Sequence, residues 1–368
     1  MPQPSLSPTP EMQHARAAGL TYATEADPGI RRAAKGTGFS YRGPGGKVIS
    51  DKETLKRIRS LAVPPAWTDV WICPKENGHI QATGRDARGR KQYRYHPDWQ
   101  TYRDRNKYER ILDFARALPR IRERVAKDMA KRGAQREKVL ATVVCLLDRT
   151  LIRIGNNEYA QDNGSYGLTT LRARHLTIEG SELRFTFKGK SGKTWRLRMK
   201  DRRIARVARA IQELPGQQLF QYVDDDGVVR SVDSADVNDY LREIAGPDVS
   251  AKDFRTWAGT VLAAMALSAI GPFETKTQAK MNLTRAITAV AERLGNTPTI
   301  CRKCYVHPEI VACYLESGLP KISVSDMEES SVGSLPSDEG AVLRLLKRRL
   351  APQRKRKAQT FAAPRVAA

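Results

Sequence analysis

The alternation of hydrophobic and polar residues divides the chain into a strand-rich first part and a helical second part. Residues 1–20 are rich in Pro, Ser and Ala, which is typical of a flexible leader. Apolar residues then recur at helical spacing over 50–61, and two short apolar runs, 69–73 and 79–83, flank a turn. We therefore predict a flexible leader followed by a small β-rich domain over 21–105.

The second domain, predicted over 106–323, carries apolar residues three and four positions apart. Prolines remove a backbone donor, so we expect Pro119 to break the first of its helices. The expected helical segments are 111–132 with that break, 137–152, 201–213, 235–244, 255–270, 276–294 and 307–317.

One segment of this helical domain has the two-residue period of strands. Apolar and polar residues alternate over 183–187 and again over 195–199, on either side of the basic turn 188–193. This pattern predicts a β-hairpin with Lys190 at its tip. The expected fold class is α+β, with a small β-rich N-terminal domain and a mainly α-helical domain that contains the hairpin.

The charge of the chain changes which partners are plausible. Its 64 Lys and Arg against 40 Asp and Glu give a net charge of +24. We expect an acidic linker over 324–340 and a basic disordered tail over 341–368. Residues 325–339 hold five acids and no base, and 340–368 hold nine bases and no acid, which leaves +20 on residues 1–324. Because most of the excess lies outside the tail, binding to a phosphate backbone explains it better than solubility alone.

Several classes of protein are disfavoured. No apolar run approaches the roughly 20 residues of a membrane-spanning helix, and no secretory signal is visible, so we expect a cytoplasmic protein. Cys301 and Cys304 form a single CxxC without a second ligand pair, and the five histidines show no metal-binding spacing. The turn Gly189–Lys193 lacks the spacing of a nucleotide-binding P-loop. We expect no metal, no cofactor and no nucleotide.

Three cations and one tyrosine stand in unusual local settings. Arg153 follows an apolar helix in Leu-Ile-Arg-Ile-Gly, Lys190 is at the hairpin tip, and Arg255 lies in Lys-Asp-Phe-Arg-Thr. Tyr305 ends the run Gly-Asn-Thr-Pro-Thr-Ile-Cys-Arg-Lys-Cys-Tyr. Each could have a structural role alone: a turn lysine, a packed tyrosine, or an arginine paired with an acid. For Arg153 the nearby acids are Asp148 and Glu158.

Taken in order, these motifs resemble the catalytic domain of type IB DNA topoisomerases of the small poxvirus-like and bacterial kind, a domain related to that of tyrosine recombinases. The resemblance covers residues 40–318. The matching features are Arg153, Gly167-Leu-Thr-Thr-Leu171 with His175, Lys190 after Phe-x-Gly, the Lys-Asp-x-Arg-Thr of Arg255, and Gly-x-Thr-Pro before Tyr305.

The resemblance implies a catalytic role for each motif. Tyr305 matches the nucleophile that forms a 3′-phosphotyrosyl link, which preserves the bond energy so that rejoining needs neither ATP nor metal. Arg153 and Arg255 match the arginines that bind the non-bridging phosphate oxygens. Lys190 matches the lysine that protonates the departing 5′-oxygen, and Lys252 matches a second lysine that assists it.

The chain departs from the family pattern at Asn296. Many members have a histidine nine residues before the tyrosine, whereas this chain has asparagine. An amide can donate a hydrogen bond to a phosphate oxygen, but it carries no charge and no acidic proton. We therefore expect Asn296 to bind a phosphate oxygen without acting as an acid.

The first domain has a match of its own in Gly89-Arg-Lys-Gln-Tyr-Arg-Tyr-His96, which resembles the family segment that contacts DNA in the major groove. The alternative is that these are ordinary surface residues of an edge strand. The implied DNA contacts are Arg90, Lys91, Gln92, Tyr93 and Tyr95 here, and Tyr159 in the second domain.

The resemblance implies a nucleoid-associated monomer that clamps duplex DNA and relaxes supercoils by transient single-strand cleavage. A tyrosine recombinase is one alternative, although such enzymes usually have His-x-x-Arg where this chain has Lys252 three residues before Arg255. A non-enzymatic DNA-compacting protein is the other, and it would not need Tyr305.

Overall fold

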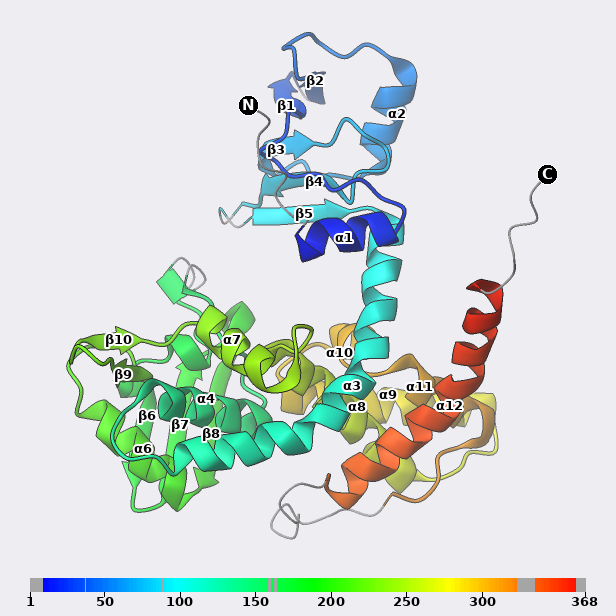
Figure 1. The fold of residues 1–368 in the computed structure, drawn as a ribbon. Coiled ribbons are helices and arrows are strands. Elements are labelled where there is room, and N and C mark those ends of the chain that lie inside the picture. The colour runs from blue at the N-terminus through cyan, green and yellow to red at the C-terminus, as the bar shows by residue number, and fades with distance from the viewer. Residues whose placement is uncertain are drawn as a thin grey trace. The chain divides into compact units, whose positions relative to one another are not determined.

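The chain divides into two compact units, residues 1–108 and 109–368, in a computed structural model (Figure 1). Each unit has its own hydrophobic core and is described by itself. The structure describes residues 9–36, 38–87, 89, 91–157, 160–161, 164–322 and 335–361.

The first unit is built on a five-stranded antiparallel sheet in the order β2-β1-β3-β4-β5. Ile58 of its helix α2 packs on Ile30, Val70, Ile72 and Ala82 of the sheet. β5 is the last strand in this order, so one of its edges is unpaired within the sheet. The elements are α1 (Pro10–Ala17), β1 (Ile30–Lys35), β2 (Gly38–Arg42), α2 (Lys52–Ser60), β3 (Thr68–Ile72), β4 (Ile80–Arg85) and β5 (Lys91–Tyr95).

The predicted flexible leader is wrong for its described part. Residues 10–17 form α1, with Thr9 as its N-cap. Ala15 is fully buried and Leu20 nearly so, and both pack in a cluster with Trp99. A segment with few large apolar residues is therefore held by close contact with one large aromatic ring. Residues 1–8 lie outside the described residues.

The second unit is mainly helical and contains the antiparallel sheet β6-β7-β8 and the small pair β9-β10. The helix α3 begins in the first unit and continues into the second. The elements are α3 (Pro97–Met129), α4 (Arg136–Thr150), β6 (Leu176–Glu179), β7 (Glu182–Lys188), β8 (Thr194–Lys200), α6 (Arg202–Gln212), β9 (Gln221–Val223), β10 (Val229–Ser231), α7 (Ser234–Ala245), α8 (Ala251–Ile270), α9 (Lys276–Leu294), α10 (Pro298–Cys304), α11 (Pro308–Ser317) and α12 (Ser337–Phe361).

The predicted hairpin is confirmed, because β7 and β8 pair as antiparallel neighbours. The α+β class is confirmed as well. The expected break at Pro119 is wrong, since α3 continues through it. A proline inside a helix costs about 3 kcal/mol. Phe114, Leu118 and Ile121 are at most 2% exposed on the same helix, and their burial offsets that cost.

The helix α8 lies at the centre of the second unit. It is predominantly apolar and contacts α4, α7, α9, α11 and α12. A helix that is apolar on nearly every side is one that is buried by its neighbours. Three polar residues on α8 are therefore buried as well, namely Arg255, Thr256 and Thr260.

The predicted disordered tail and acidic linker also differ from the structure. Residues 337–361 form α12, and Val342, Leu343 and Leu346 are buried in the core of the second unit. These residues share one helical face, so the helix is held by packing despite its basic composition. Residues 324–334 of the linker and 362–368 of the tail lie outside the described residues.

Candidate active site

Tyr305 lies at the C-terminal end of α10 and its main chain rests on α8. Its carbonyl oxygen accepts a hydrogen bond from Thr260 Oγ1 at 3.2 Å. A Cβ atom on Gly259 would lie 2.7 Å from the Tyr305 carbonyl oxygen and 2.9 Å from the Tyr305 Cβ. Glycine at 259 therefore lets the tyrosine approach the helix backbone, and Thr260 fixes it there.

Arg255 lies one helical turn before Gly259 and so faces the same way. Its guanidinium carbon is 5.0 Å from the centre of the Tyr305 ring, and the residue is only 4% exposed. The guanidinium donates to the carbonyl oxygen of Leu151 and, at 2.6 Å, to that of Leu294. These neutral acceptors hold the arginine in place without cancelling its charge.

The charges of this cluster make Tyr305 easier to ionise than an ordinary tyrosine. Burial by itself would raise the pKa of Tyr305. The charge of Arg255, its hydrogen bond to the tyrosine and the charge of Arg153 outweigh burial, so the pKa lies below its ordinary value. Burial, and then the charge of Arg153, lower the pKa of Arg255.

Arg153 and Asn296 form a second pair in the same cluster. A guanidinium nitrogen of Arg153 donates to Asn296 Oδ1. The sequence suggested Asp148 as an acid partner, but Asp148 instead pairs with Arg122 at 2.7 Å. The other suggested acid, Glu158, lies outside the described residues.

The cluster leaves two buried donor atoms unused. Arg255 Nε and Asn296 Nδ2 are buried and have no hydrogen-bond partner among the described residues. Buried donors are usually paired, and an unpaired one often marks a site that binds a ligand. Together with two charged guanidinium groups, these donors are suited to an anion with several oxygens, such as a phosphodiester.

Lys190 is exposed at the tip of the β7–β8 hairpin, in the short 3₁₀ turn Lys190–Gly192. Its ammonium group has no hydrogen bond or ion pair with any described residue. The turn end of the hairpin is connected to the Arg153 segment, because Tyr166 N donates to the Lys188 carbonyl at 2.8 Å and Leu168 N to that of Arg153 at 2.9 Å.

Lys252 lies in the first turn of α8, three residues before Arg255. It is exposed, and its ammonium has no ion pair with the part of the chain that the structure describes. The structure thus pairs Arg153 with Asn296 and Arg255 with Tyr305 by direct contact, and the charge of Arg153 acts on both members of the second pair. It connects Lys190 and Lys252 to them only through the main chain and neighbouring residues.

In the first unit, the edge strand β5 separates the expected DNA contacts onto two faces. Tyr93 and Tyr95 stack with ring centres 5.7 Å apart, and the Lys91 ammonium lies 5.8 Å from the Tyr93 ring centre. Gln92 points to the other face, where its amide donates to Asp86 at 3.0 Å. Arg90 and Tyr159 lie outside the described residues.

Sequence reasoning missed Gly259, Thr260 and the close approach of Gly155 to Gly167. A Cβ atom on Gly167 would lie 2.5 Å from the Gly155 Cα, so both glycines are needed where the Arg153 segment turns. A glycine inside the apolar run of α8 was a visible signal of close backbone approach. The sequence could not say which segment approached.

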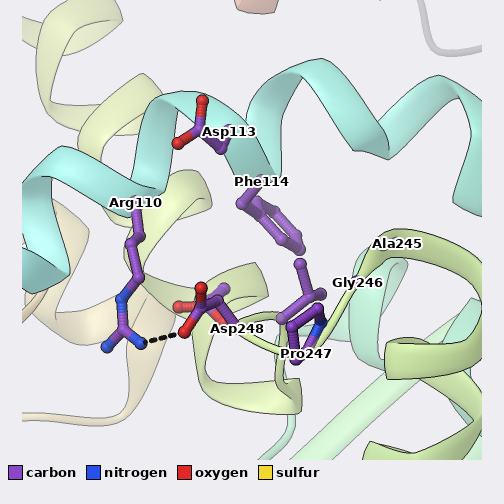
Figure 2. A pocket seen from close by; sticks show the side chains of 9 residues that line it. Arg110, Asp113, Phe114, Ala245, Gly246, Pro247 and Asp248 are labelled. Carbon is purple, nitrogen blue, oxygen red and sulfur yellow. Dashed lines mark hydrogen bonds and ion pairs between the residues drawn. The ribbon is translucent and has the colours of Figure 1, made fainter. Parts of the chain in front are cut away.

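A separate pocket lies between α3 and the turn that joins α7 to α8 (Figure 2). Its lining includes Phe114 and Pro247, and Arg110 donates to Asp248 across it at 2.9 Å. None of the residues of the Tyr305 cluster lines this pocket.

No grouping of metal-ligand side chains suited to an ion occurs among the described residues. Within the same residues, no helix has the length and apolar character needed to cross a membrane.

Known proteins resemble both parts of the chain. A family model described as "Eukaryotic DNA topoisomerase I, catalytic core" matches residues 96–318, and one described as "Bacterial DNA topoisomerase IB, N-terminal domain" matches residues 38–86. The DNA topoisomerase 1B of Acanthamoeba polyphaga mimivirus is 31% identical over 286 residues, which are 76% of this chain and 85% of that protein. The DNA topoisomerase 1B of Vaccinia virus (strain Copenhagen) is 24% identical over 147 residues, 39% of this chain and 47% of the relative. The first matched region contains the whole Tyr305 cluster together with Lys190 and Lys252.

Proposed function

We propose that this chain, which belongs to the type IB DNA topoisomerase family, uses Tyr305 to cut and rejoin one strand of supercoiled duplex DNA without ATP or metal. The observation that supports this most directly is the half-buried ring of Tyr305 beneath the Arg255 guanidinium, with the tyrosine pKa lowered by two arginines. A tyrosine that serves only in packing would not need two cations beside it that pair with no acid among the described residues.

In the proposed reaction, ionised Tyr305 attacks the phosphorus, a bond forms from its oxygen, and the bond to the 5′-oxygen breaks. Lys190 gives a proton to the departing 5′-oxygen, with Lys252 assisting. Arg153 and Arg255 bind the non-bridging oxygens, on which charge develops in the transition state. The same steps in reverse rejoin the strand, so the cycle consumes no cofactor.

Asn296 would contribute its unused Nδ2 donor to a phosphate oxygen while its Oδ1 holds Arg153. This assignment agrees with an amide where relatives of the family have histidine, because the amide is a hydrogen-bond donor with no acidic proton.

For DNA binding, we propose that the face of β5 that carries Lys91, Tyr93 and Tyr95 contacts the duplex. Tyr93 is 40% exposed and stacked on Tyr95, so its ring is available to a sugar or base. Gln92 would first have to leave Asp86 before it could contact a base. Arg90 and Tyr159 complete the proposed set of contacts.

We further propose a monomer that clamps the duplex with its two domains, 21–105 for DNA binding and 106–323 for catalysis, and that works in the cytoplasm on the nucleoid. The charge of +20 on residues 1–324 supports contact with the DNA backbone along both domains.

Plasmid relaxation in EDTA without ATP tests the proposed function. We expect wild-type protein to relax the plasmid and Tyr305→Phe to have no detectable activity, because the phenyl ring has no nucleophile. Tyr222→Phe, which alters a tyrosine on β9 outside the cluster, is the matched control and should remain active. Relaxation by Tyr305→Phe, or a strict requirement for Mg²⁺ or ATP, would refute the proposal.

A further inference from the structure

The indole ring of Trp195 contacts two glycines, and each of them immediately precedes a residue of the proposed active site. A Cβ atom on Gly189, before Lys190, would lie 2.7 Å from Trp195 Nε1. A Cβ atom on Gly295, before Asn296, would lie 2.7 Å from Trp195 Cζ2. Both positions therefore need glycine for the ring to fit, and one rigid side chain joins the hairpin turn to the Asn296 segment.

The hairpin is held firmly below this contact. Phe187 and Trp195 are cross-strand partners, and their rings stack with centres 6.2 Å apart and planes 1° apart. Gly189 N donates to the Lys193 carbonyl at 2.8 Å, which closes the turn. Trp195 is thus fixed on the strand side, and its outer edge sets where the turn lies.

The Asn296 side of the contact is held by main-chain hydrogen bonds and by Arg153. Gly295 ends α9 in the left-handed conformation, with φ of 61°, and Asn296 N donates to the Ala291 carbonyl at 2.8 Å. Asn296 also accepts a hydrogen bond from Arg153. A shift of the indole ring would therefore act on the hairpin turn, which has fewer restraints than this segment.

We propose that Trp195 is a positioning residue that sets the distance between the Lys190 ammonium and the phosphate held at Arg153 and Asn296. The proposal rests on the proposed function, in which Lys190 is the general acid. Lys190 is exposed and has no partner among the described residues, so its own side chain does not fix its place. A general acid must come within about 3 Å of its target atom.

The reason for the expected effect is geometric. Removing the indole ring would leave a space between Gly189 and Gly295, and the turn would move into it or fluctuate. A misplacement of about 1 Å can slow a reaction by about 100-fold. Only the protonation of the leaving oxygen should suffer, because the contacts of Tyr305 with Arg255, Gly259 and Thr260 do not involve Trp195.

Single-turnover cleavage at saturating DNA tests the proposal on two substrates. One has the natural bridging 5′-oxygen, and the other has sulfur there, which leaves without needing a proton. We expect Trp195→Ala to slow cleavage of the oxygen substrate about 10- to 100-fold and that of the sulfur substrate much less. The double variant Trp195→Ala/Lys190→Ala should be no slower than Lys190→Ala alone.

Two further variants separate positioning from general damage to the sheet. Leu197→Ala loosens the same strand without touching either glycine, so any slowing should be equal on both substrates. Gly189→Ala should slow the oxygen substrate because its Cβ meets the indole, and Trp195→Ala should remove this additional defect. Gly189 has φ of −96°, so alanine causes no backbone strain of its own.

The outcomes distinguish the two proposals. If Lys190→Ala slows both substrates equally, the acid role of Lys190 fails and the positioning role fails with it. If Lys190→Ala spares the sulfur substrate but Trp195→Ala slows both equally, or adds to Lys190→Ala, only the positioning role is overturned.

Discussion

At the scale of single residues, the chemistry depends on how α8 presents one face to Tyr305. Arg255 supplies charge above the ring, and Gly259 and Thr260 fix the tyrosine main chain one turn later. Burial raises the pKa of the phenol, and the arginines overcome that effect. The same burial strengthens the effect of the arginines, because charges interact more strongly in a medium of low dielectric constant.

Replacing Arg255 by alanine should slow single-turnover cleavage by about 100- to 1000-fold, as expected for loss of a donor to transition-state charge. Without the cation the pKa of Tyr305 should rise, so the ascending limb of the pH–rate profile should move to higher pH. Arg255→Lys should retain part of the shift in the Tyr305 pKa, but it should lose the bidentate contact with the phosphate oxygens. An unchanged position of the limb in Arg255→Ala would show that Arg255 does not control ionisation of Tyr305.

Gly259→Ala should abolish most cleavage while the protein still folds, because the new Cβ would lie 2.7 Å from the Tyr305 carbonyl. The matched control is Gly340→Ala in α12, where the nearest atom is the flexible end of Arg344 at 3.3 Å. Alanine there should be neutral or stabilise the fold by up to about 1 kcal/mol. Cleavage rates and thermal melts of both variants check the contrast, and normal cleavage by Gly259→Ala would contradict it.

At the scale of elements, the hydrophobic period predicted the helices that have a long apolar face. It did not predict short elements that are stabilised mainly by contacts with other segments. It identified α4, α7, α8 and α9, but it did not predict the seven-residue α10 or the small strands β9 and β10. Short elements bury few residues, so their periodicity is too brief to recognise. Most of the helix α12 was predicted to be disordered, because its basic composition is typical of a disordered tail.

An ion network connects α12 to the rest of the second unit. Arg122 contacts Asp148 at 2.7 Å and Glu339 at 2.8 Å, and the Glu339 side chain is 14% exposed. Further along, Arg349 pairs with Glu309 and Glu316 of α11, the helix that follows Tyr305. These contacts attach α12 to the rest of the second unit.

Arg122→Ala should therefore destabilise the protein by about 2–4 kcal/mol, because two largely buried carboxylates lose their cation. The surface substitution Arg206→Ala on α6 is the control, with an expected change within about 0.5 kcal/mol. Denaturant unfolding measures both. If α12 were a detached tail, Arg122→Ala would still affect Asp148, but the effect would be unchanged by Glu339→Gln in a double-mutant cycle, whereas the observed network predicts coupling.

At the scale of the whole molecule, the net charge of +24 indicates the kind of partner but not how the chain folds. The charge indicates a polyanionic partner and can be counted from the sequence alone. The net charge does not show that the basic residues of 337–361 belong to a helix whose apolar side is buried in the second unit. Charge is additive along a chain, whereas burial depends on which segments meet.

The sequence by itself determined the family, through five short motifs in order, and the α+β class, through the change from a helical to a two-residue period. It also identified the residues that carry the proposed reaction. Only the tertiary structure decided that Arg153 bonds Asn296, that Asp148 pairs with Arg122 instead of Arg153, that Gly259 accommodates Tyr305, and that Trp195 joins the two glycines. The physical reason is that a motif records which groups are present along the chain. Distances of a few ångströms between segments far apart in the sequence depend on how the buried helices pack around α8.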